Sequence, residues 1–427
     1  MIGVAIGVLV GLLALSLPVA AALMGLGLTL DIFYSFLPLR RVLGDTAWGV
    51  ATDVVLFSIP LFVMLGEIML RSGIAERMYD AMARWLGWLP GGLMHANVGT
   101  CTMFAAISGS SVATAATVGT VAVGQIKAQG YNERLFLGTI AAGGTLGILI
   151  PPSIPLIIYA ALTDTSIPQL YLAGILPGLI LALLFMLTVI LACVLRPSWG
   201  GQRPRVTWAE RRACLPDLLP PFLIFVAVIG SIYAGLATPT ESAALGVLAA
   251  LVLAWRLKAL SLAMLRAVFE GTMRTTAMIM LILTAAYFLN FIIGSIGLGR
   301  MVTEAIGALG LTPTETIIAI VVFYFVLGMF METLSMMVAT VPLVMPVVVS
   351  LGLDPVWFGV LMMLLLETAL ITPPVGFNLF VVQGVRERGP VKDVVIGAVP
   401  FVMTLLVMIA LLIAFPQIAL WLPQALR

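Results

Sequence analysis

The stretch LGILIPPSIPLIIYAAL, residues 146–162, decides the fold. It ends a longer run, residues 135–162, that contains no charged side chain. A proline inside a helix removes a backbone donor and leaves a carbonyl one turn earlier without its partner. Hydrocarbon offers no water to that carbonyl, so non-helical backbone at membrane depth must be buried in protein or line a cavity. Pro151 and Pro152 therefore predict a broken helix whose freed carbonyls bind something else.

The composition of the whole chain indicates a membrane protein. Of its 427 residues, 62% are hydrophobic and only 9% are charged, and the mean hydropathy is +1.19. Apolar runs of about 20 residues, the length that crosses a bilayer as a helix, recur from one end to the other. We therefore expect a polytopic all-α protein. The first run, residues 1–23, lacks a basic start and is expected to be retained rather than cleaved as a signal.

Charge and cysteine usage exclude two other classes. The net charge is only +2, and no cluster of basic and aromatic residues predicts nucleic-acid binding. Cys101, Cys193 and Cys214 are odd in number and have no metal-ligand spacing, so neither a disulfide framework nor a transition-metal site is expected.

The chain repeats its own plan. ILIPPSIPLIIY, from Ile148, returns as LITPPVGFNLFV, from Leu370, so the two diproline sites are offset by 222 residues. An offset of 221 places Pro18 on Pro239 near the start of each half. Chance matches in apolar sequence are the alternative, but these helix breakers are rare residues at a nearly constant spacing. Two repeats of one plan are therefore expected.

Each repeat is interpreted as scaffold spans, an interfacial helix, a hairpin, a broken helix and a last span. The first repeat, 1–195, has scaffold spans in 1–70 (at 3–17, 18–37 and 50–70), an interfacial helix at 71–89, a hairpin at 91–128, a broken helix at 134–162 and a span at 168–195. A cytoplasmic linker, 196–217, follows. The second repeat, 218–427, has scaffold spans in 218–296, an interfacial helix at 297–312, a hairpin at 314–350, a broken helix at 356–383 and a span at 394–422.

The hairpins are expected to be re-entrant. Each arm of the first one has about 15 apolar residues and reaches only about 22 Å as a helix, which is less than the roughly 30 Å of hydrocarbon. Polar residues lie between the arms, at 108–111 in the first repeat and at 330–335 in the second. These polar tips are expected to lie inside the protein.

Counting crossings predicts that the repeats are inverted. If a hairpin does not cross the membrane, each repeat crosses it five times. Because five is an odd number, the second repeat starts on the opposite side of the membrane from the first. With both termini in the periplasm, seventeen of the 21 basic residues are cytoplasmic, which agrees with the positive-inside rule. Arg40 and Arg41 are exceptions that the sequence does not explain.

Inverted repeats with broken helices are typical of secondary transporters. The carbonyls before each diproline face a hairpin tip, which supplies hydroxyls in the first repeat (Ser108, Ser110, Ser111) and a carboxylate with hydroxyls in the second (Glu332, Thr333, Ser335). A ligand set of oxygens alone suits a hard cation such as sodium. The alternative interpretation is that the prolines only kink the helices and that no ion binds there.

Three motifs together resemble the large membrane subunit of tripartite ATP-independent periplasmic (TRAP) transporters. They are SGSSVATAATVGT, GILIPPSIPLIIY and TPPVGFNLF. The resemblance implies a sodium-driven importer of organic anions, often carboxylates, in the bacterial inner membrane. A periplasmic binding protein would deliver the anion, and hairpins and broken helices would slide against a scaffold as an elevator. It also implies a small four-helix membrane subunit, expected as a separate chain because no such block precedes Met1, with membrane lipid around both.

The resemblance also places sites, residue by residue. The first sodium would lie among Ser108, Ser110, Ser111, Gly144, Thr145 and Pro151. The second would lie among Glu332, Thr333, Ser335, Thr368, Thr372 and Pro373. Apart from the resemblance, the substrate anion is expected to contact Ser110, Thr114, Ser153, Gly376 and Asn378, because Ser153 and Asn378 lie close to the breaks, where a helix N-terminus favours an anion. No other cofactor is implied.

Single polar residues in apolar stretches each allow a functional and a structural interpretation. Glu367 marks an ion or proton pathway, or is a partnered structural acid. His95, the only histidine, is more consistent with packing than with a proton relay. Asp53 and Glu67 lie in a scaffold span and serve a site or lock helices together. Arg274 begins a span and is expected to extend toward the interface, with a contact to the substrate as the alternative.

Other functions remain as alternatives. A proton-coupled antiporter would use Glu332 and Glu367 as carriers. An intramembrane hydrolase would use a serine of SGSS, but His95 is the only candidate base and no third member is evident; no enzyme activity is therefore expected. A non-transporting scaffold would leave the paired polar breaks unexplained.

Overall fold

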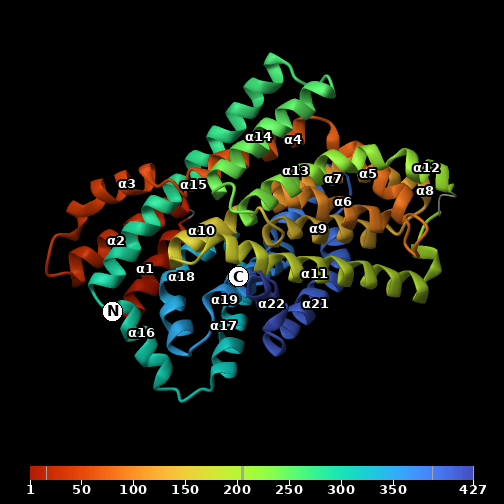
Figure 1. Ribbon diagram of the computed structural model, residues 1–427. Coiled ribbons are helices and arrows are strands. Elements are labelled where there is room, and N and C mark those ends of the chain that lie inside the picture. Colours follow the sequence, from red (N-terminus) through yellow and green to blue (C-terminus); the bar gives the residue numbers. More distant parts are fainter. Residues whose placement is uncertain (16, 203–205, 387, 427) are drawn as a thin grey trace.

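The computed structural model of the protein describes residues 1–15, 17–202, 206–386 and 388–426. Its regular elements there are helices, joined by one isolated β-bridge between Tyr131 and Gly200, so the prediction of an all-α fold is confirmed (Figure 1). Six helical segments in the described residues are long and apolar enough to cross a membrane, and a bent pair brings the number to seven. Several others, such as α2 with 16 residues, are shorter.

The first half of the chain contains α1 to α11. Their bounds are α1 Ile2–Ala14, α2 Val19–Tyr34, η1 Leu39–Val42, α3 Leu43–Thr52, α4 Ser58–Arg71, α5 Ile74–Leu86, α6 Leu93–Ser108, α7 Ser111–Ala122, α8 Gln125–Gln129, α9 Glu133–Leu149, α10 Ile154–Thr163 and α11 Ile167–Leu195. Helices α6 and α7 turn back on each other at residues 109–110, and α9 is separated from α10 at Pro151 and Pro152.

The second half contains the remaining helices. Their bounds are η2 Pro197–Trp199, α12 Trp208–Ala213, α13 Leu215–Tyr233, α14 Pro239–Arg256, α15 Leu262–Ser295, α16 Leu298–Gly307, α17 Pro313–Gly328, α18 Thr333–Ser350, α19 Pro355–Ile371, α20 Phe377–Arg386, α21 Val391–Ala414 and α22 Gln417–Ala425. Helices α17 and α18 correspond to α6 and α7, and α19 with α20 corresponds to α9 with α10.

Two helix boundaries differ from the expected ones. The span expected at 50–70 is interrupted between α3 and α4, because Asp53 Oδ1 accepts the backbone N–H groups of Val55 (2.7 Å) and Leu56 (3.2 Å) and turns the chain there. The span expected at 394–422 ends at Ala414, and the separate helix α22 begins at Gln417, after its N-cap residue Pro416.

The two broken helices run in opposite directions. At one end, the hydroxyl of Tyr159, late in α10, donates to the carbonyl of Pro355, the first residue of α19, at 2.7 Å. At the other end, Arg386, the last residue of α20, donates to Glu133, the first residue of α9, at 2.9 Å. The start of each broken helix therefore lies at the end of the other, as inverted repeats require.

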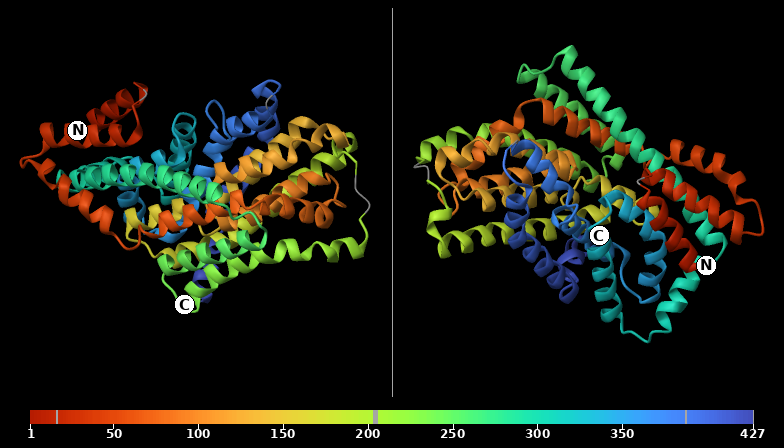
Figure 2. Two further views of the ribbon diagram at one scale, coloured as in Figure 1. Left: turned by 90° about the horizontal axis from the view of Figure 1, so that it is seen from above. Right: turned by 180° about the vertical axis from the view of Figure 1, so that it is seen from behind.

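The helices pack in two groups. One group, linked by contacts from helix to helix, contains both hairpins: α6, α7, α9, α17, α18, α19, α20 and α21. Helices α2, α4, α13, α14 and α15 form a second set of contacts. The figures show the long helix α15 beside α2 at the end of the molecule that carries the N-terminus (Figures 1 and 2). We call these the hairpin group and the scaffold group.

Candidate functional site

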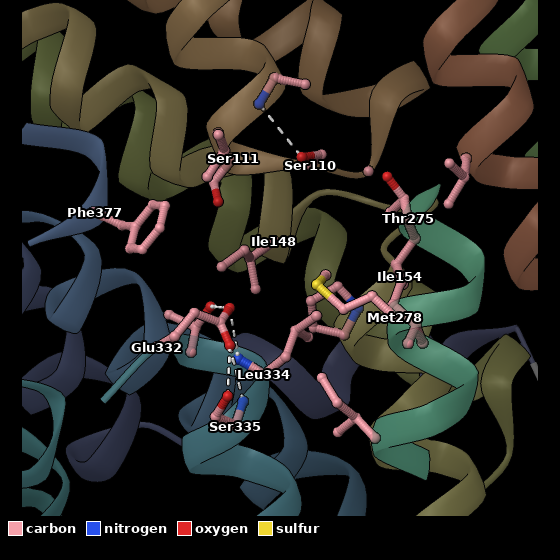
Figure 3. A pocket seen from close by; sticks show the side chains of 18 of the residues that line it. Ser110, Ser111, Ile148, Ile154, Thr275, Met278, Glu332, Leu334, Ser335 and Phe377 are labelled. Atoms are coloured by element: carbon pink, nitrogen blue, oxygen red, sulfur yellow. Dashed lines mark hydrogen bonds between the residues drawn. The ribbon is translucent and has the colours of Figure 1, made fainter. Parts of the chain in front are cut away.

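A cavity of about 640 Å³ lies between the two groups. Both hairpin tips reach it from the hairpin group, and α2, α4 and α15 close it from the scaffold group (Figure 3). Its polar or charged lining side chains come from Glu67, Ser108, Ser110, Ser111, Thr275, Glu332, Thr333 and Ser335. The volume falls within the range of small-molecule sites.

The first tip is packed directly on the first break. Gly109 has φ +59°, and a Cβ there would lie 2.7 Å from the carbonyl oxygen of Pro152. A Cβ on Gly147 would lie 2.7 Å from the carbonyl carbon of Ser110. Ser110 then begins α7, because its hydroxyl accepts the N–H of Ala113 at 3.4 Å. Glycine at both contact points thus brings the tip and the break together without intervening side chains.

The second tip is built around a carboxylate. Glu332 caps α18: Oε1 accepts the N–H of Leu334 (3.1 Å) and Oε2 accepts the N–H of Ser335 (3.0 Å). The hydroxyls of Thr333 (3.0 Å) and Ser335 (2.9 Å) donate to the same two oxygens. A negative charge is favoured at a helix N-terminus. At the offset of 222, Glu332 occupies the place of Ser110 in the first repeat.

The breaks themselves are more fully hydrogen-bonded than the sequence suggested. The Ser153 hydroxyl donates to the carbonyl of Ile148 and also caps α10. In the second repeat the Thr372 hydroxyl donates to Thr368 O at 2.6 Å, and the Thr368 hydroxyl donates to Leu364 O at 2.7 Å. Both prolyl bonds, Pro151–Pro152 and Pro373–Pro374, are cis. Local hydroxyls therefore bond the carbonyl of Ile148 before the first break and that of Thr368 before the second.

The structure divides the predicted site residues into two layers. The tip residues line the cavity: Ser108, Ser110, Ser111, Glu332, Thr333 and Ser335. In the described part of the chain, the break residues lie outside its lining: Gly144, Thr145, Pro151, Thr368, Thr372 and Pro373. Of the residues expected to contact substrate, Ser110 lines it, whereas Thr114, Ser153, Gly376 and Asn378 lie behind it among the described residues.

Asn378 joins the two repeats behind the cavity. Its side-chain amide donates to the carbonyl of Ala141, in α9, at 3.2 Å. Gly144 leaves room for it, because a Cβ on Gly144 would lie 3.1 Å from that nitrogen. Asn378 is wholly buried, so the structure gives it a contact between broken helices.

The sequence did not mark several lining residues of the scaffold group. Thr275 and Met278 of α15 face the tips across the cavity (Figure 3). Gly66 of α4 also lines it, and a Cβ there would lie 3.1 Å from the carbonyl of Ser108. Thr275 directly follows Arg274 in the sequence, but a single threonine in an apolar helix does not by itself predict a binding-site residue. Arg274 itself is exposed.

Other marked residues have structural partners. Glu67 lines the cavity and pairs with Arg71 at 3.0 Å, against Gly271 of α15. The wholly buried His95 has its Nε2 2.8 Å from the carbonyl of Pro90. Arg40 pairs with the buried Asp31 at 3.3 Å.

The cavity has an acidic lining among the residues that the structure describes, although Glu67 is paired with Arg71. Its charged lining side chains, Glu67 and Glu332, are both acids, and no lysine, arginine or histidine of the described chain lines it. The N-terminus of α7 contributes the opposite partial charge. An anion held here therefore needs a bound cation or uncharged donors.

Comparison with known proteins identifies the family. Residues 6–418 match the family described as "Tripartite ATP-independent periplasmic transporter, DctM component". The chain belongs to this family. A TRAP large permease is a component of a transporter rather than an enzyme, so the expected function class is confirmed.

Named TRAP relatives cover nearly the same length. The chain is 34% identical to the C4-dicarboxylate TRAP transporter large permease protein DctM of Pseudomonas aeruginosa, over 90% of both chains. It is 33% identical to the ectoine large permease TeaC of Halomonas elongata, over 86% of both. It is 31% identical to the sialic acid large permease SiaM of Vibrio cholerae, over 97% of this chain and 96% of that one.

A solved structure shares the fold of this TRAP permease. The YdaH transporter of Alcanivorax borkumensis superposes with a TM-score of 0.69 over 93% of this chain and 96% of its own. At 16% identity this likeness concerns the fold alone. This likeness supports the polytopic α-helical architecture.

Proposed function

We propose that the protein is a sodium-coupled secondary importer of a small organic carboxylate. It acts in the bacterial inner membrane with a periplasmic substrate-binding protein and a separate four-helix membrane subunit, and its termini are periplasmic. Family membership supports the tripartite assembly. The names of relatives, which include C4-dicarboxylate, sialic acid and ectoine permeases, support a small organic solute.

The observation that carries sodium coupling is the acidic cavity between two oxygen-rich tips. An organic anion that enters beside Glu332 meets a charge of its own sign. Sodium bound by the tips would remove this repulsion, and the oxygens of Ser108, Ser110 and Ser111, and of Glu332, Thr333 and Ser335, are suitable hard ligands. Binding of the anion would then depend on sodium.

An elevator mechanism is supported by the position of this cavity. It lies between the hairpin group and the scaffold group, so a displacement of one group against the other carries the tips while α2, α4 and α15 stay in place. The first tip would remain packed on its break during such a movement.

Uptake into proteoliposomes tests the proposal. The chain, its small subunit and its binding protein are reconstituted, and a thermal-shift screen of the binding protein against C4-dicarboxylates, sialic acid, ectoine and 2,3-diketo-L-gulonate selects the solute. Uptake is then measured under an inward sodium gradient and under a potassium gradient of equal size. We expect uptake only with sodium, and equal uptake with potassium would refute sodium coupling.

Two substitutions test the placement of the sites. Ser110→Ala and Thr372→Ala are expected to raise the sodium concentration that gives half-maximal uptake. Ser261→Ala is the control for Ser110, because Ser261 caps α15 through the N–H of Met264 at 3.1 Å and lies outside the lining of the cavity in the described structure. A control that changes sodium dependence equally would contradict the placement.

A proton-coupled antiporter is the second candidate function. Glu367 favours it, because this acid is wholly buried in the hairpin group. Removal of the pH dependence of uptake by Glu367→Gln, together with uptake that does not depend on sodium, would establish it.

A further inference from the structure

The scaffold side of the cavity has one uncharged polar side chain among the described residues, that of Thr275. Helix α15 contributes Thr275 and four apolar residues to the lining, and α2 and α4 contribute apolar residues, Gly66 and Glu67. Glu67 is already paired with Arg71. Thr275 is therefore the neutral hydrogen-bonding group that the scaffold presents to a solute.

The hydroxyl of Thr275 has no hydrogen-bond partner in the described part of the chain. A threonine inside a helix often donates to the carbonyl four residues earlier. Thr284 of the same helix does so, to the carbonyl of Met280 at 2.9 Å. Figure 3 shows the Thr275 hydroxyl pointing into the cavity instead, so its proton is available to a bound molecule.

The hydroxyl protons of the second tip are already used. Thr333 and Ser335 donate to the two carboxylate oxygens of Glu332, at 3.0 and 2.9 Å. A hydroxyl has one proton and two lone pairs, so both can still give an oxygen to a cation but no proton to an anion. With the charge of Glu332 beside them, they make the second tip unsuitable for a carboxylate.

The first tip keeps two hydroxyl protons. Ser110 accepts the N–H of Ala113 and donates to no described group. Ser111 is buried, with an exposed fraction of 6%, has no partner among the described residues, and points into the cavity (Figure 3). Ser108 differs, because it is bonded to Thr114 at 3.1 Å and the Thr114 proton goes to the carbonyl of Ser110. Ser110 and Ser111 also begin α7, where a helix favours negative charge.

We propose that Thr275 is the contact of the scaffold with the solute, and that its hydroxyl donates to the carboxylate that Ser110 and Ser111 bind at the start of α7. The anion then receives three protons at the tip that lacks an acid. The serine oxygens can bind sodium through their lone pairs at the same time. This inference rests on the proposed import of a carboxylate, but it does not depend on sodium coupling.

Equilibrium binding to the purified permease with its small subunit tests this role. The probes are radiolabelled succinate, sialic acid, ectoine and 2,3-diketo-L-gulonate, each of which carries a carboxylate, in saturating sodium. Thr275→Val keeps the shape of the side chain and removes the hydroxyl. We expect the dissociation constant of the probe that binds to rise about tenfold, the effect of one hydrogen bond to a charged group. Thr275→Ser keeps the hydroxyl and is expected to bind almost as the wild type does.

Thr276→Val is the matched control. Its hydroxyl, one residue further along α15, also has no partner among the described residues but lies outside the lining of the cavity there. Both valine variants are expected to unfold at the wild-type temperature, because neither loses a hydrogen bond. Wild-type affinity in Thr275→Val, or an equal loss in Thr276→Val, overturns this inference alone. A wild-type protein that binds none of the four probes would overturn the proposed carboxylate import as well.

Discussion

Glu332 performs two tasks with one carboxylate. It ends the turn of the second tip by capping α18, and it places a negative charge at the cavity. Ser110 performs the first task in the other repeat without the charge. The two tips are therefore equivalent in backbone and different in electrostatics, which gives the second tip the stronger attraction for a cation.

Glu332→Ala is expected to lower stability and sodium affinity together. Loss of a helix cap costs about 1 kcal/mol, so the unfolding temperature falls, and loss of the charge raises the sodium concentration needed for uptake. Thermal unfolding and sodium titration of uptake measure the two effects separately.

Asp354→Ala is the matched control for this prediction. Asp354 caps α19 through the N–H groups of Val356 (2.7 Å) and Trp357 (3.3 Å) and lies outside the lining of the cavity in the described structure. We expect the same loss of stability with unchanged sodium dependence. Equal sodium effects in both variants would show that Glu332 acts only as a cap.

At the scale of elements, the crossing of α9 and α21 joins the repeats. A Cβ on Gly138 would lie 2.0 Å from the carbonyl oxygen of Gly397, and a Cβ on Gly397 would lie 1.8 Å from that of Arg134. The two backbones thus touch where the first repeat meets the second, and only glycine fits at either position.

Gly397→Ala is expected to destabilise the protein by about 3 kcal/mol, the upper part of the usual range for overpacking, because the added methyl group meets backbone that cannot move aside. Thermal unfolding in detergent measures the effect. Gly384→Ala is the control, since no atom lies within 4 Å of a Cβ there and alanine favours a helix; a similar loss in both variants would contradict the packing argument.

At the scale of the molecule, both tips open into one cavity although they belong to oppositely directed repeats. A single cavity predicts that Ser110→Cys and Ser335→Cys react with a membrane-impermeant thiol reagent from the same side of the membrane in any one state. The native cysteines are all buried, so the wild type provides the background. Labelling of the two positions from opposite sides would contradict a shared cavity.

The sequence predicts the breaks and tips better than it predicts the cavity. Diproline sites, and a serine or an acid at the same offset, are local signals, because proline and a helix cap act on the chain that carries them. Thr275 and Gly66 line the cavity through packing between segments distant in sequence, and no local pattern marks them.

Two details that the sequence did not predict have the same physical origin. At the breaks, the Ser153 hydroxyl donates to the carbonyl of Ile148 and the Thr372 hydroxyl donates to that of Thr368. Likewise, Asp53 ends α3 by bonding its own following backbone. Short polar side chains near a break can form hydrogen bonds with the free backbone groups there. Whether they do so depends on which rotamer the packing allows.

The contact of the first tip with its break has a mechanical consequence. With glycine at residues 109 and 147, the backbone of the tip contacts the backbone of the break. A hinge between them would therefore leave a void between two surfaces that are now in direct contact. The tip is therefore unsuited to act as a separate lid over the cavity. In the elevator movement that we propose, the first tip and the first break would therefore travel together as one unit.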